Sequence, residues 1–144
     1  MNNKGFTLVE LIATIALLAV ISIISFVSIN AVIDSSKINE CNALVNSIKS
    51  ATKEYVSDNR YNLDEIKIYK MEGSDKKYNF PASVLVDTKK ISSQIINPFE
   101  DDESINNVTN TTFIEVTLNS DYTAKKIEVK NSSGNKIDCD SKKW

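Results

Sequence analysis

Histidine is absent from this 144-residue chain, and arginine occurs only once, at Arg60. Histidine is the commonest general base and a leading metal ligand in proteins. The chain also shows no glycine-rich phosphate loop and no nucleophile placed beside a base. We therefore predict that the protein is not an enzyme, and we predict no cofactor and no metal site.

A strong excess of either charge is also missing. The chain has 17 Lys and Arg against 19 Asp and Glu, a formal net charge of −2. No polybasic surface is indicated, so we expect no specific nucleic-acid partner. The acidic run Glu100-Asp101-Asp102-Glu103 offers oxygen ligands of the kind that calcium favours. A solvated acidic loop is the favoured interpretation of that run.

Proline and glycine are absent from residue 6 to residue 71, so nothing in the sequence interrupts a helix there. Residues 6–33 form an apolar run in which Glu10 is the only ionisable side chain. About 20 apolar residues cross a bilayer as a helix, so this run is long enough to span one. It is too long for a secretory signal peptide, and no small-x-small cleavage site follows it before Asp34. A plain single-pass anchor is the simplest reading of hydropathy alone.

Glu10 is the feature that a plain anchor does not explain. A carboxylate at the centre of a bilayer costs at least about 2.5 kcal/mol on insertion scales. Something should therefore neutralise Glu10, unless the side chain extends to the interface near the helix end.

The residues around Glu10 resemble a known signature. Lys4-Gly5-Phe6-Thr7-Leu8-Val9-Glu10, followed by the apolar run, is similar to the N-terminal signature of type IV pilins and pseudopilins. The resemblance covers roughly residues 4 to 33. Many pilins carry a helix-breaking Pro within this half of the helix, and this chain departs from them.

The resemblance implies a processing and assembly pathway. A prepilin peptidase would cut between Gly5 and Phe6, and the new Phe6 amine would be methylated. Glu10 would then pair with the Phe6 amine of a neighbouring subunit and relieve both desolvation costs. An assembly ATPase and a membrane platform would move the subunit from a single-pass membrane position into an extracellular filament of pilin subunits.

Three functions follow from this reading. The first is a structural subunit of a type IV pilus, serving adhesion, motility or surface interaction. The second is a pseudopilin of a type II secretion or DNA-uptake machine. The third is a membrane-anchored binding domain that does not polymerise; cleavage after Gly5 separates it from the other two.

The fold is predicted to be α+β. Apolar residues at three- and four-residue spacing continue the helix to about residue 57, and alternating residues predict strands at 111–118, 124–130 and 136–140. Pro81 predicts a short helix over about 82–90. We expect a leader at 1–5, a hydrophobic helix half at 6–33, and a globular head at 34–144. The amphipathic half of the long helix should pack on a small antiparallel sheet.

Cys41 and Cys139 are the only cysteines. Cys41 lies on the inward stripe of the helix, and Cys139 lies in the last predicted strand, which should cover that stripe. They can form one disulfide in an exported domain, or remain two small buried hydrophobic side chains. The first alternative departs from the usual pilin pattern, in which both cysteines lie near the C-terminus.

Overall fold

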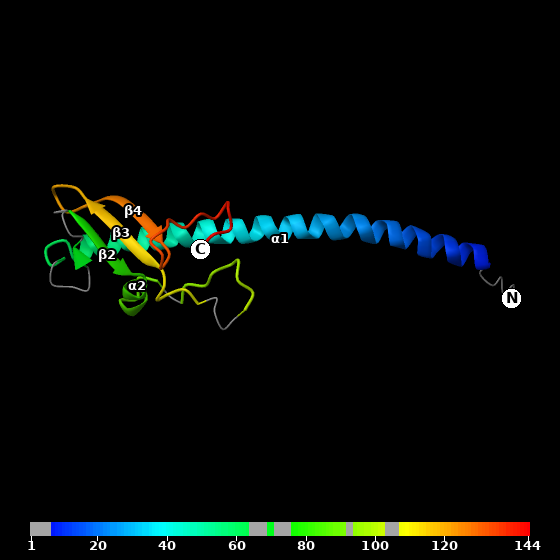
Figure 1. Cartoon of the computed structure of the whole chain (residues 1–144), viewed down its shortest axis with the longest axis horizontal. Coiled ribbons are helices and arrows are strands. Elements are labelled where there is room, and N and C mark those ends of the chain that lie inside the picture. The colour runs from blue at the N-terminus through cyan, green and yellow to red at the C-terminus, as the bar shows by residue number, and fades with distance from the viewer. Residues whose placement is uncertain (1–6, 64–68, 71–75, 92–93, 103–106) are drawn as a thin grey trace. The chain divides into compact units, whose positions relative to one another are not determined.

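The computed structural model describes residues 7–63, 69–70, 76–91, 94–102 and 107–144. The chain divides into two compact units, Met1–Ser36 and Lys37–Trp144. Its elements follow the order α1 (Leu8–Asp58), β1 (Tyr69–Lys70), β2 (Lys77–Pro81), α2 (Ser83–Asp87), β3 (Phe113–Leu118) and β4 (Ala124–Lys130) (Figure 1).

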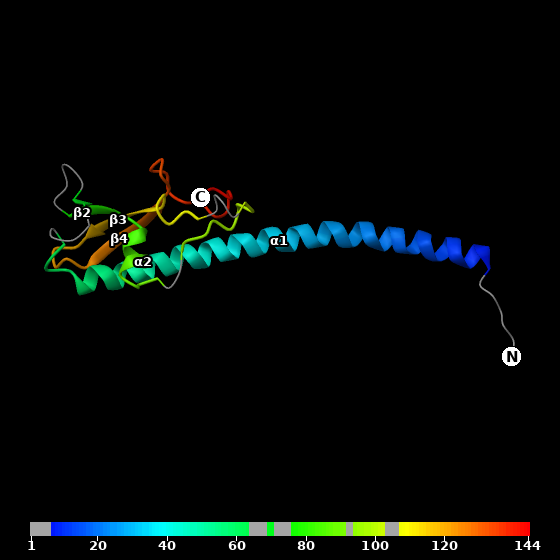
Figure 2. The same ribbon diagram turned by 90° about the horizontal axis from the view of Figure 1, so that it is seen from below.

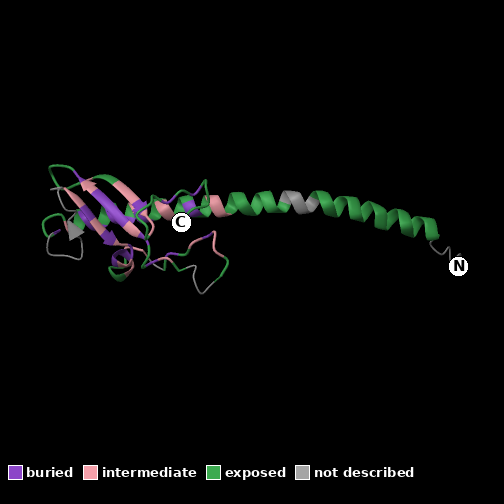
Figure 3. Ribbon diagram, viewed as in Figure 1, coloured by how far each residue is buried: buried purple, intermediate pink, exposed green. Residues whose placement is uncertain are grey.

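The first unit contains the N-terminal part of α1. Its described side chains are exposed throughout (Figure 3), and the large apolar ones among them range from 47% exposure at Ile33 to 75% at Val9. The Ser22 hydroxyl donates to the Leu18 carbonyl one turn earlier, at 2.8 Å, so this serine adds no unsatisfied polar group to an apolar surface. The predicted helix over residues 6 to about 57 is confirmed within the described residues.

The second unit begins with the amphipathic part of α1. The predicted inward stripe is buried at its central positions and partly buried at Leu44 and Val45. The fully or nearly fully buried members are Cys41, Ile48, Ala51, Thr52 and Tyr55. This stripe supplies one wall of the core of the second unit.

The sheet supplies the other wall. Its strand order is β1-β2-β3-β4, and every neighbouring pair is antiparallel. Alternate residues of β2 and β3 point inward and are buried, including Phe80, Ile114 and Val116. The Tyr55 and Phe80 rings lie 5.8 Å apart between their centroids and join α1 to the sheet. Figure 2 shows β2, β3 and β4 lying along the C-terminal part of α1, and the predicted α+β arrangement is confirmed.

The predicted strand at 136–140 is wrong. Residues in this segment form only isolated bridges, Lys130 with Lys136 and Asp138 with Lys143. The reason is local: the Asp138 side chain accepts hydrogen bonds from the backbone N–H groups of Asp140 and Ser141 and folds the segment into a turn. The third full strand of the sheet is β2, a segment for which the sequence pattern predicts no strand.

Pro81 occupies a different place from the one predicted. It is the last residue of β2, paired with Phe113, and α2 follows it over Ser83–Asp87. A proline is tolerated there because it sits at a strand end, beyond the two β2 residues that pair with β1. The helix is shorter than the predicted 82–90, since Lys89 adopts a positive φ of 60° that ends helical geometry.

Glu115 is a charged side chain on the outward face of β3, yet its residue exposure is only 8%. The Lys130 ammonium donates to its carboxylate at 2.7 Å, and the Lys77 ammonium lies 3.8 Å from it. A carboxylate this buried needs such partners. The outer face is therefore held by a charge cluster that spans β2, β3 and β4.

Candidate processing and assembly site

Thr7 and Glu10 form a reciprocal set of hydrogen bonds at the start of α1. The backbone N–H and the hydroxyl of Thr7 both donate to Glu10 Oε2, each at 2.8 Å. The backbone N–H of Glu10 donates to Thr7 Oγ1 at 3.3 Å. This is a capping box, in which the residue before the helix and the residue three positions later satisfy each other's backbone donors.

The capping box explains why the helix begins at Leu8. The first N–H groups of a helix have no partner within it, and a side-chain oxygen at the preceding residue supplies one. The Glu10 carboxylate also lies in the first turn, where the helix dipole favours negative charge. Glu10 is thus held in place by its own chain, and both hydrogen bonds from Thr7 to its carboxylate end on the Oε2 atom.

Sequence reasoning missed Thr7, although the signal was available. A Thr followed three residues later by Glu, directly before an apolar run, is a known helix-start pattern. Gly5 and Phe6, the predicted processing residues, lie outside the described residues. Their roles therefore stay predictions.

The apolar part of α1 is long enough to cross a membrane. Within the described residues, α1 is the one helix that meets this criterion, with a mean hydropathy of 2.7 over its most apolar window and none of that window buried. An unburied apolar surface of this length is unfavourable in water. It fits a membrane-anchored precursor.

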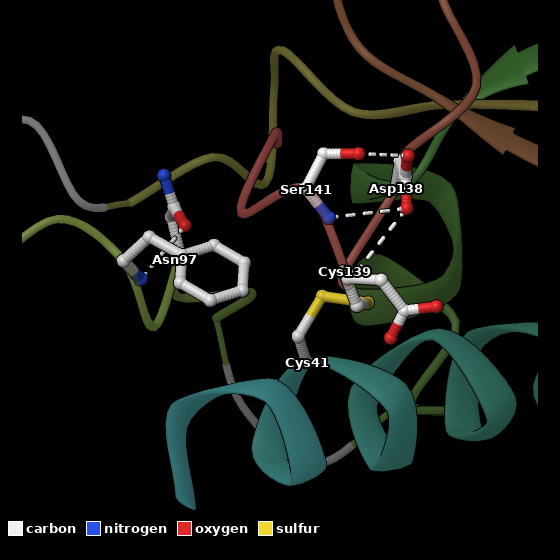
Figure 4. The surroundings of a disulfide bond; sticks show 7 residues. Cys41, Asn97, Asp138, Cys139 and Ser141 are labelled. Atoms are coloured by element: carbon white, nitrogen blue, oxygen red, sulfur yellow. Dashed lines mark hydrogen bonds between the residues drawn. A yellow bond between two sulfur atoms is a disulfide. The ribbon is translucent and has the colours of Figure 1, made fainter. Parts of the chain in front are cut away.

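Cys41 of α1 and Cys139 are joined by a disulfide in the structure, with their Cα atoms 5.7 Å apart (Figure 4). Cys41 is fully buried and Cys139 is 6% exposed. The bond closes a segment of 98 residues that includes the whole sheet. It fastens the C-terminal segment to the helix at a point where no strand pairing holds it.

Asp138 organises the turn that carries Cys139. Figure 4 shows the Asp138 carboxylate facing Ser141, whose hydroxyl and backbone N–H both donate to it. These hydrogen bonds, together with one from the Asp140 N–H, hold the pKa of Asp138 below its usual range.

On the other side of the disulfide, Asn97 Oδ1 accepts a hydrogen bond from the Phe99 N–H at 3.0 Å.

The acidic run at 100–103 does not gather ligands for a metal within the described residues. No group of three or more acidic, cysteine or histidine side chains there can hold an ion. Asp101 instead forms an ion pair with Lys37 of α1 at 2.6 Å, while its side chain stays 87% exposed. Glu103 lies outside the described residues.

Comparison with known proteins identifies the N-terminal segment. Residues 1–26 match the family model of the prokaryotic N-terminal methylation motif. This motif is the prepilin-type signature of type IV pilins and pseudopilins, so the predicted resemblance is confirmed. Neither the curated proteins nor the solved structures gave a match to this chain.

Proposed function

We propose that this protein is a structural, non-enzymatic subunit of a type IV pilus filament. The observation that carries the proposal is the methylation motif at residues 1–26, which includes the exposed apolar start of α1. A monomer offers that helix no partner. Lipid covers it before assembly, and other copies of the helix cover it afterwards.

The chain would have three parts in this pathway. Residues 1–5 form a leader that prepilin peptidase removes between Gly5 and Phe6. Residues 6–33 form the hydrophobic half that spans the membrane and later packs in the filament core. Residues 34–144 form the head, which stays outside the cell.

Glu10 would link neighbouring subunits through the Phe6 amine. The capping box uses Oε2, and within the described residues the second carboxylate oxygen is left to accept a hydrogen bond from that amine. The Thr7 contacts fix the carboxylate before assembly, which reduces the entropy lost when the pair forms. In this proposal Thr7 prepares Glu10, and Glu10 sets the register between copies.

The proposed partners follow from the motif. They are prepilin peptidase, an assembly ATPase with its membrane platform, and other pilin subunits. The subunit begins as a single-pass membrane protein and ends in an extracellular filament. The filament would serve adhesion, motility or surface interaction.

The test compares sheared surface filaments from host cells with and without an active assembly ATPase. We expect the chain in the sheared fraction only when the ATPase is active. A pseudopilin would be processed yet missing from long surface filaments, and a non-polymerising anchored domain would be neither processed nor sheared. Either result would overturn the pilus assignment.

A further inference from the structure

A basic groove lies in the second unit between the amphipathic part of α1 and strand β4. We define it by Lys49, Ser50 and Lys53 of α1, and by Lys125, Lys126 and Ile127 of β4. The two helix lysines are one turn apart, so both reach the same flank of α1. The groove is therefore lined by four lysines from two elements that lie far apart in the sequence.

Most of this charge is not neutralised. Within the described residues, Lys49, Lys53 and Lys125 make no ion pair, while Lys126 pairs with Glu128 at 3.0 Å. By contrast, Lys90 on another side of the unit bridges Glu54 and Asp58 at 2.7 and 2.6 Å. Lysines on an edge strand such as β4 also discourage unwanted strand pairing. That role does not account for the two helix lysines.

An acidic face lies on the other flank of α1. We define it by Glu40 of α1 and by Glu100, Asp101 and Asp102 of the loop between α2 and β3. Glu40 lines a shallow groove with Leu44, Gln94 and Ile96, which leads from α1 to the loop. Glu40, Asp101 and Asp102 are exposed. Asp101 pairs with Lys37 at 2.6 Å but stays 87% exposed, and among the described residues Glu40 has no ion-pair partner.

Helix geometry sets the two surfaces apart. Glu40 and Lys49 are nine residues apart, which is two and a half turns at 3.6 residues per turn, so they point to opposite sides of α1. The same spacing separates them by about 14 Å along the helix at 1.5 Å per residue. The two surfaces therefore face different directions and lie at different heights.

We propose that the basic groove of one copy binds the acidic face of a second copy of this chain. This inference rests on the proposed filament function. Because the two surfaces differ and lie on opposite sides, the contact is heterologous and leaves one surface of each kind free on the pair. Such contacts extend into open helical assemblies, and copies with parallel helices would be staggered by about 14 Å.

Charge and composition favour a second copy over a nucleic acid. No aromatic residue and no arginine lines the basic groove among the described residues, so it offers no stacking platform for bases. The whole chain carries a net charge of −2, which opposes binding to a polyanion. Every copy, in contrast, supplies the acidic side chains that the groove requires.

The experiment uses charge reversal in the full chain, expressed in host cells. Lys49→Glu with Lys53→Glu should lower incorporation into sheared filaments by on the order of tenfold, since the reversal removes the attraction of two exposed lysines and adds repulsion. Adding Glu40→Lys with Glu100→Lys to the same chain should restore most of the incorporation. Lys136→Glu with Lys143→Glu is the matched control, with the same charge change on exposed lysines elsewhere, and should change little.

The outcomes separate this contact from the filament function. Restored incorporation of the chain that carries both the groove and the acidic-face substitutions supports the contact, because a misfolded variant would not regain incorporation. The proposed contact is overturned if the groove substitutions leave incorporation unchanged, or if adding the acidic-face substitutions does not restore it. Salt-sensitive binding of a mixed-sequence DNA oligonucleotide, lost on groove reversal while incorporation is unchanged, would assign the groove to a polyanion instead. A wild-type chain that never enters filaments would contradict the filament function itself.

Discussion

The two units of this chain differ in whether the apolar side chains of α1 are buried or exposed. In Lys37–Trp144, the apolar stripe of α1 is covered by the chain's own sheet, as the burial of Ile48 and Val116 shows. In Met1–Ser36, the described apolar side chains of the same helix are exposed, as Ile23 is at 69%. The comparison teaches that one helix combines a segment that packs on the chain's own sheet with a segment whose described apolar side chains remain uncovered.

The largest effect is expected from the processing residue of the first unit. Gly5→Leu should block cleavage because a bulky side chain hinders access to the extended backbone, and filament incorporation should fall to background. The head should fold as before. The measurement is immunoblotting of membrane and sheared fractions, with Gly5→Ala as the smaller control. Normal incorporation of uncleaved Gly5→Leu protein would break the link between processing and assembly.

The second unit should respond to loss of its disulfide. Cys41→Ser with Cys139→Ser removes a bond that closes 98 residues. The free energy of unfolding of the head should fall by about 4–5 kcal/mol in the chain-entropy model. Chemical denaturation of the full chain in detergent, followed by the fluorescence of Trp144, measures this change. Cleavage after Gly5 should be unaffected, and a head of unchanged stability would show that the turn around Asp138 holds the segment alone.

Glu10→Ala should affect assembly and not the head. Removal of a charge from the apolar span should ease membrane insertion. The neighbour's amine would lose its partner, and breaking a buried pair costs roughly 3–5 kcal/mol, which corresponds to at least about a hundredfold loss of incorporation. The test is the amount of subunit in sheared filaments at matched membrane levels. Equal incorporation would reduce Glu10 to a helix cap.

Thr7→Val separates the cap from the charge pair. The change removes the hydroxyl that bonds to Glu10 while keeping the shape of the side chain. Loss of a helix cap costs about 1 kcal/mol, so the backbone N–H of Glu10 should exchange with solvent about fivefold faster in detergent micelles. Thr7→Ser keeps the hydroxyl and should exchange at the wild-type rate. Exchange at the wild-type rate in Thr7→Val would show that the Thr7 hydroxyl does not protect this N–H group. The bond from the Thr7 backbone N–H to the Glu10 carboxylate would then be enough to hold the start of the helix.

The smallest effect concerns pH. Hydrogen bonds from Thr123 and Ser141 lower the pKa values of Asp121 and Asp138, so their stabilisation is present above the unfolded pKa of about 3.9 and is lost as pH falls through the lower folded value. Hydrogen bonds from Lys90 to Asp58 and Glu54 raise the pKa of Lys90, and burial raises that of Tyr55. Their stabilisation is present below about pH 10 and is lost as pH rises through the folded values.

Since the chain also has no histidine, the thermal midpoint of the head should be flat between about pH 5 and about pH 9. Thermal scans across this range test the expectation. Asp138→Asn should reduce the fall of the thermal midpoint at acid pH and leave its fall at alkaline pH unchanged. A midpoint that shifts strongly near neutral pH would contradict the assignment of these groups.

Local patterns predicted local structure, and pairing across long distances was not accessible. The long helix, β3 and β4 follow from spacing within one segment. The strand β2 was missed because its partner β3 lies more than thirty residues later and Pro81 suggested a helix start. The strand predicted at residues 136–140 is wrong. Ile137 and Cys139 alternate with polar residues and are both buried, as in a strand, but the turn around Asp138 prevents continuous strand pairing.

The candidate site shows the same division. Glu10 and its neighbourhood were readable because the motif is contiguous. The position of Cys139 over the inward stripe was predicted, but the 5.7 Å approach to Cys41 required the fold. The basic groove was not predicted, since Lys49 and Lys125 meet only once β4 is placed beside α1.

The most direct test of the central claim is mass analysis of the N-terminus of the protein from its host, in both membranes and sheared filaments. Our account predicts a mature chain that begins at a methylated Phe6 in both fractions. Mature protein that still begins at Met1, recovered from cells with an active prepilin peptidase, would contradict the account.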